Sequence, residues 1–322
     1  MPYRFRNPKR LMQFTCSAVA LAALGACGGG DGSWGSGKGE APASGQLSIT
    51  VANQLQVAGQ VLRAANGLAL NDGLEPGTVR RTHPNDLLQK VFEAINTEVP
   101  KREGTSYSFS VACGSDAAAG AVNVAVTLKT AKVLAAGDNA QVTVQTCQLN
   151  QVWFGGAAKI EYTANVNGEF NAVFSNFALQ EGTEKFILNG DSLIAKAGDA
   201  YLNTGKRLVL ARYSNNVLID EKELTEYTLR SGNKSFGLGG KFLYKGAKPG
   251  NFQAEINNAS IFIASDKYPV LGRLTVLGSS YSMLALAPLG TNAMRIDFTD
   301  QKDGKITNSQ NSTYEDVQKA LN

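Results

Sequence analysis

From Ser106 onward, apolar and polar residues alternate along the chain with a period of two. Tyr107, Phe109 and Val111 alternate with serines, and the run over 122–128 repeats the pattern. Strict alternation is typical of antiparallel strands that bury one face and expose the other. The same pattern predicts further strands near 142–144, 160–166, 170–179, 185–195, 207–213, 217–222, 223–230, 239–244, 252–256, 260–264, 274–277, 283–287 and 294–298.

Before this region the hydrophobic period is helical. Apolar residues at spacings of three and four predict amphipathic helices near 50–65 and 85–97. Asn66-Gly67 is typical of the end of the first helix, and Asn85 can cap the start of the second. A third, short helix is expected over 313–321 at the end of the chain.

Helices that precede a long run of strands give the α+β order rather than alternating βαβ units. The sequence therefore predicts a mainly β fold: a long antiparallel β-meander with two N-terminal helices and a short C-terminal helix. Such a meander must limit its exposed edges, and it can form an open or closed barrel or a sandwich. Asn189-Gly190 has the composition of a type I′ hairpin turn.

Residues 1–26 have the organisation of a secretory signal peptide. A basic region with Arg4, Arg6, Lys9 and Arg10 precedes an apolar stretch over 11–24. That stretch is shorter than the about 20 residues that a membrane-spanning helix needs, and it ends in small residues, as cleaved signals do.

The signal ends in Leu24-Gly25-Ala26-Cys27, which resembles the lipobox of bacterial lipoproteins. The resemblance implies cleavage before Cys27, diacylation of its thiol by chains such as palmitate, and acylation of the new amine. Two or more acyl chains anchor a protein stably to a membrane. In the enterobacterial sorting rule, Asp after the lipidated Cys favours retention in the inner membrane. Gly28 stands there, so the resemblance implies an outer-membrane anchor, with the periplasmic or surface-exposed face left open.

The chain is therefore expected to have three parts. Residues 1–26 are the signal, residues 27–45 are the lipidated Cys and a Gly/Ser-rich tether, and residues 46–322 form a single β-rich domain. A flexible tether of this composition has a root-mean-square reach of roughly 20–25 Å. The layout of the domain is loosely similar to envelope lipoproteins with an incomplete or closed antiparallel β-barrel.

The four cysteines follow from this organisation. Cys16 leaves with the signal and Cys27 takes the lipid, so Cys113 and Cys147 remain in an oxidising compartment. Pairing is the default there, and we expect a disulfide between them. A metal or redox pair is the alternative, but neither residue has CxxC spacing or a neighbouring His.

Two further groups of residues are candidate sites. Trp153 and Phe154 could form a stacking platform for a sugar or peptide, although such pairs more often pack in a core or beside a bulge. Asp297, Asp300 and Asp303 are weak calcium candidates, because their spacing fails the EF-hand pattern and no bidentate Glu follows. A solvated turn explains them as well.

Composition narrows the function classes. Apolar residues make up 43%, more than a disordered chain has, and the single His excludes metal sites that need two or three imidazoles. Four of the 31 basic residues lie in the signal, so the mature chain has 27 basic and 27 acidic residues and gives no support for nucleic-acid binding.

We therefore expect a lipid-anchored cell-envelope lipoprotein that acts as a non-catalytic binding or structural module, without a cofactor. Its partners would be the membrane, through the anchor, and an envelope protein, a glycan or a lipid as ligand. Two alternatives remain open: a carrier that holds an acyl chain or other apolar ligand in a half-barrel, and a carboxylate-based hydrolase, which needs two carboxylates about 5–10 Å apart in a cleft.

Overall fold

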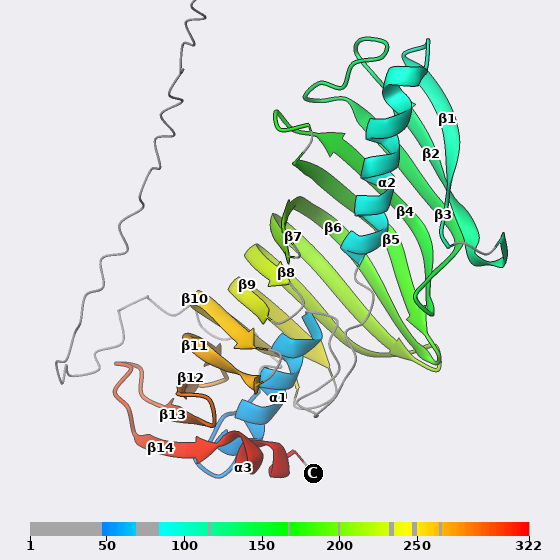
Figure 1. The fold of residues 1–322 in the computed structure, drawn as a ribbon. Coiled ribbons are helices and arrows are strands. Elements are labelled where there is room, and N and C mark those ends of the chain that lie inside the picture. Colours follow the sequence, from blue (N-terminus) through cyan, green and yellow to red (C-terminus); the bar gives the residue numbers. More distant parts are fainter. Residues whose placement is uncertain are drawn as a thin grey trace, which may run out of the picture. The chain divides into compact units, whose positions relative to one another are not determined.

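The computed structural model describes residues 47–68, 84–114, 117–166, 168–198, 200–231, 235–246, 250–263 and 266–321. The signal, Cys27 and the tether lie outside these residues, as does His83. The described chain forms the helices α1 (Gln54–Leu68), α2 (Pro84–Glu98) and α3 (Tyr314–Lys319), two short 3-10 turns, and strands (Figure 1). The strands are β1 (Ser106–Ala112), β2 (Gly120–Thr127), β3 (Asn139–Leu149), β4 (Val152–Tyr162), β5 (Glu169–Glu181), β6 (Glu184–Ala197), β7 (Ala200–Ser214), β8 (Val217–Ser231), β9 (Ser235–Gly246), β10 (Phe252–Ile263), β11 (Asp266–Leu277), β12 (Met283–Leu289), β13 (Ala293–Thr299) and β14 (Asn308–Thr313).

These strands form one open antiparallel sheet in which each strand pairs with its neighbours in sequence. The order runs from β1 to β14 without a crossover, so the described sheet is a continuous meander with β1 and β14 at its edges. The predicted mainly β class, the two N-terminal helices and the C-terminal helix are confirmed. Of the architectures that the sequence left open, the described strands take the open form.

One face of the sheet is covered by the helices. Phe92 of α2 is stacked between Tyr162 of β4 and Phe170 of β5, with ring centroids 5.2 and 4.7 Å away. At the other end of the sheet, α1 packs against β12, β13 and α3. Figure 1 shows α2 lying across the strands near β4 and β5, and α1 beside α3. The apolar positions of the strands therefore face the amphipathic helices, as the two hydrophobic periods require.

A row of β-bulges crosses the sheet from β3 to β10. In β3, β5 and β8 the register shifts between Val144 and Cys147, between Phe174 and Phe177, and between Thr225 and Thr228. At each shift the buried positions change from even to odd residue numbers. A bulge bends its strand and increases the local twist, so bulges in successive strands bend the whole sheet along one line.

Asn189-Gly190, predicted to be a hairpin turn, lies inside β6 on this line, and the prediction was wrong. Gly190 has a φ of +124°, and a Cβ there would meet the carbonyl oxygen of Arg207 in β7. Glycine is needed at this position for close approach of two strands at the bulge rather than for a turn.

Other boundaries also differ from the predictions. Helix α1 begins at Gln54 instead of near residue 50, after a turn in which the side chains of Thr50 and Asn53 accept hydrogen bonds from each other's backbone N–H. The helix then continues through Asn66-Gly67 to Leu68. The segments 217–222 and 223–230 are one strand, β8, as are 252–256 and 260–264 in β10, and β14 was not predicted.

Candidate functional site

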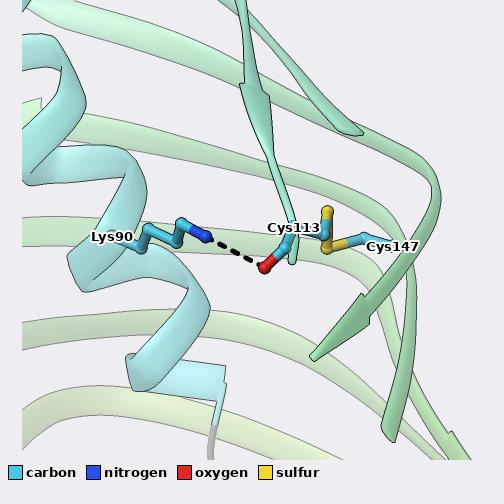
Figure 2. Close-up of a disulfide and its surroundings, with 3 residues drawn as sticks. All are labelled: Lys90, Cys113 and Cys147. Atoms are coloured by element: carbon cyan, nitrogen blue, oxygen red, sulfur yellow. Dashed lines mark hydrogen bonds between the residues drawn. A yellow bond between two sulfur atoms is a disulfide. The ribbon is translucent and has the colours of Figure 1, made fainter. Parts of the chain in front are cut away.

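The predicted disulfide between Cys113 and Cys147 is present. The two Sγ atoms are 2.06 Å apart, and both residues are completely buried. Cys113 directly follows β1, and Cys147 lies in β3 opposite Gly120 of β2. Lys90 of α2 donates a hydrogen bond from Nζ to the carbonyl oxygen of Cys113, at 2.9 Å (Figure 2). The bridge therefore joins the first three strands at a point where α2 is also attached.

Trp153 and Phe154 do not form a single platform. As neighbours in β4 they point to opposite faces of the sheet. Phe154 is buried, with its ring centroid 6.1 Å from that of Phe177, whereas the side chain of Trp153 is 42% exposed. Of this predicted pair, Trp153 is the ring that a ligand can reach.

The acidic candidates are likewise separated. Asp297 of β13 is buried, and its Oδ1 accepts hydrogen bonds from Nε of Arg295 and Oγ of Ser309, each at 2.7 Å. Asp300 and Asp303 are exposed, and Asp303 accepts from the backbone N–H of Lys305 in the turn before β14. Within the described parts of the chain, no group of three or more His, Cys, Asp or Glu side chains could hold a metal ion.

A cluster of charged side chains that the sequence did not predict lies on the helix-covered face of β7, β8 and β9. The ionic cluster consists of Arg212, Asp220, Lys222 and Tyr244. Asp220 accepts from Nζ of Lys222 at 2.6 Å through Oδ1 and from Nε of Arg212 at 3.0 Å through Oδ2. Lys222 and Asp220 each expose only 4% of the side chain. Because moving each ion out of water costs several kcal/mol, such a cluster persists only where the charges satisfy one another.

Tyr244 completes the cluster through its ring. Nζ of Lys222 lies 5.8 Å from the ring centroid, within the range of a cation–π contact. Burial, and to a smaller extent the charge of Asp220, raises the pKa of Tyr244 to about 12. The phenol is therefore neutral at physiological pH and acts here as a packing and polar contact group.

The sequence signal for this cluster was present but ambiguous. Asp220, Lys222 and Leu224 share one parity in β8, and Glu221 and Glu223 share the other. A period of two puts charges on both faces, and nothing local says which face is buried. The pairing partners decide it, because Leu224 lies opposite Leu208 and Phe242 in the core.

Directly beyond the ionic cluster, the β7–β8 hairpin presents three consecutive apolar side chains to solvent. Val217, Leu218 and Ile219, which we call the hairpin tip, are 63%, 52% and 38% exposed. Asn215 and Asn216 form the turn with φ of +49° and +63°, as a type I′ turn requires. A contiguous exposed apolar group of this kind is typical of a contact surface.

A β-bulge fixes the hairpin tip relative to the ionic cluster. Arg212 pairs with Asp220, but the next residue, Tyr213, pairs with Leu218, so Ile219 is the extra residue of the bulge. The hydrogen bond from Arg212 to Asp220 therefore ties the two strands together at the base of the tip. The buried charges hold the hairpin in one register while its apolar end remains in solvent.

Comparisons with known proteins add no relative: no family model, no curated protein and no solved structure matches this chain. Among the described residues, no helix is both long and apolar enough to cross a membrane.

Proposed function

We propose that this protein is a lipid-anchored lipoprotein of the bacterial cell envelope that acts as a non-catalytic binding or structural module. The observation that carries the proposal is the lipobox-like sequence that ends at Cys27, followed by a Gly/Ser-rich segment up to residue 45 and then by a folded β-rich domain. Acyl chains on Cys27 would hold the protein at the membrane, and the tether would let the domain meet a partner beside it.

The buried disulfide supports an extracytoplasmic location. Cys113 and Cys147 are joined, and structural disulfides of this kind persist in the periplasm and at cell surfaces but are rare in the reducing cytosol. The predicted signal peptide would export the chain to an oxidising compartment, and the two cysteines would be oxidised to the disulfide there.

The buried acids of the described residues support a non-catalytic role. Asp220 and Asp297 are held by cationic side chains, and Asp138 accepts from the backbone N–H groups of Lys129 and Ala135. A carboxylate whose oxygens hold a turn or a cation serves the fold, whereas a general base must be within reach of a substrate proton.

Substitution of the lipobox cysteine tests the anchor. We expect Cys27→Ala to abolish acylation and lipobox cleavage, so that a non-acylated precursor accumulates, which mass spectrometry detects by its retained signal and the missing acyl mass. Cys16→Ala is the matched control, because it alters another signal-region cysteine and should leave acylation and cleavage unchanged. Mass spectrometry of the mature wild-type protein should show an acylated Cys27 at the N-terminus.

An unmodified N-terminus at another residue would contradict the anchor. The outer-membrane assignment is tested separately, by density fractionation of the two membranes. Recovery of the acylated protein in the inner-membrane fraction would contradict that assignment while leaving the lipoprotein proposal intact.

A further inference from the structure

We infer that the hairpin tip, Val217 to Ile219, inserts into the surface of the bilayer that holds the lipid anchor. This inference rests on the proposed function, since it presumes acylation at Cys27. It adds that one defined edge of the sheet faces the lipid.

The first argument is the place where the tether joins the domain. Leu47 donates its N–H to the carbonyl oxygen of Asn251 at 2.7 Å, and its own carbonyl oxygen accepts from the N–H of Ser279 at 2.8 Å. Asn251 precedes β10, and Ser279 lies between β11 and β12. The described chain therefore starts at the edge of the sheet where β9 connects to β10 and β11 connects to β12.

The hairpin tip lies at this same edge. Strands alternate in direction along the meander, so the β7–β8, β9–β10 and β11–β12 connections all lie at one edge. This edge is the side of the sheet where the strands end, and it is distinct from the edge strands β1 and β14. We call it the anchor edge, and it also carries the β3–β4 connection. The β8–β9, β10–β11 and β12–β13 connections lie at the opposite edge. The hairpin tip and Leu47 therefore lie at the same end of the strands.

The distances are compatible with simultaneous contact. β8 and β10 are two strand positions apart, which is about 10 Å at the usual spacing between strands. A Gly/Ser-rich tether of this length reaches roughly 20–25 Å. An acylated Cys27 therefore keeps the bilayer within reach of the hairpin tip, which raises the local concentration of lipid at that point.

The hairpin tip is the apolar part of the anchor edge, whereas the β5–β6 and β13–β14 connections at that edge carry exposed charges such as Glu181 and Lys302. Val217 and Leu218 expose more than half of each side chain. Trp153 near the start of β4 and Tyr281 before β12, 42% and 41% exposed, lie at the same edge. Aromatic rings with a polar atom are favoured at the membrane–water interface. Each ring lies four strand positions from β8, about 19 Å at the usual spacing between strands, one on either side of the hairpin tip.

A fluorophore at the hairpin tip tests the inference with the full acylated protein. In the oxidised mature chain, Leu218→Cys supplies a reactive thiol for an environment-sensitive label. Leu289→Cys is the matched control, because Leu289 is an apolar residue, 44% exposed, at the opposite edge, at the end of β12. Both proteins are reconstituted into vesicles of phosphatidylethanolamine and phosphatidylglycerol, with or without a lipid that carries a quencher on its acyl chain.

We expect the label at position 218 to shift its emission to the blue and to lose intensity with the lipid-borne quencher, while the label at 289 changes in neither respect. Flotation of the vesicles is measured first, and it separates the two claims. A protein that does not float overturns the anchor and the inference with it. A protein that floats but shows no lipid quenching at 218, or equal quenching at both positions, overturns the inference while the anchor stands.

The remaining alternative is a protein contact at the hairpin tip. It would shield the label at 218 from a water-soluble quencher without exposing it to the lipid-borne one, and that result also overturns the inference. Far-UV circular dichroism of both labelled variants confirms that the sheet is intact in each comparison.

Discussion

The Cys113–Cys147 bridge gives a stability change whose size can be worked out in advance. The two residues are 34 positions apart in the sequence. In the chain-entropy model, opening a loop of that length returns conformational freedom to the unfolded state and lowers the free energy of unfolding by about 3–4 kcal/mol at 25 °C. The double variant Cys113→Ala/Cys147→Ala should show this loss, because it opens the loop and removes only two sulfur atoms from the core.

The assay is urea denaturation of the detergent-solubilised mature protein, followed by far-UV circular dichroism. The difference in midpoint, multiplied by the slope of the transition, gives the change in free energy of unfolding. Wild-type protein reduced with dithiothreitol is the control, since its loop is opened without any substitution. Its midpoint should fall to that of the double variant within the error of the extrapolation.

Two results would refute this reasoning. A loss below about 1 kcal/mol would mean that the unfolded chain is already compact in this region, so that the bridge restrains little. A reduced wild type much more stable than the double variant would mean that burial of the two thiols, rather than loop closure, provides the stabilisation.

Two further substitutions test the core and the ionic cluster. Phe92→Ala should lower the free energy of unfolding by about 3–5 kcal/mol in the same denaturation assay, because it removes a buried ring that stacks on two others. Phe92→Leu should lower it clearly less, and equal losses in the two variants would contradict a contribution from ring stacking. Asp220→Ala should lower the free energy of unfolding by about 3–5 kcal/mol, since Lys222 and Arg212 lose their shared carboxylate. Adding Lys222→Met should recover most of that loss. No recovery in the double variant would show that Asp220 and Lys222 do not act as a pair.

The sequence by itself indicated the helices, most of the strands and the pairing of the cysteines. Two hydrophobic periods gave the helices and the antiparallel strands, because periodicity depends only on which side of each element is buried. The pairing of Cys113 with Cys147 followed by elimination from the predicted fates of Cys16 and Cys27. The edge strand β14 escaped prediction because its residues are uniformly polar, so no alternation marks it.

The register of the strands was decided only in the tertiary structure. Each bulge shifts the hydrophobic alternation from even to odd residues, but that shift alone does not distinguish a bulge within one strand from a break between two strands. Asn189-Gly190 shows the difficulty. The same dipeptide can form a hairpin turn or lie at a β-bulge, and here its pairing with β7 places it at a bulge. The alternation of β8 allowed two faces for Asp220 and Lys222, and its pairing with β7 and β9 placed them in the core. Long-range pairing likewise brought Leu47 and the hairpin tip to one edge of the sheet, which local sequence patterns do not encode because their range ends within each strand.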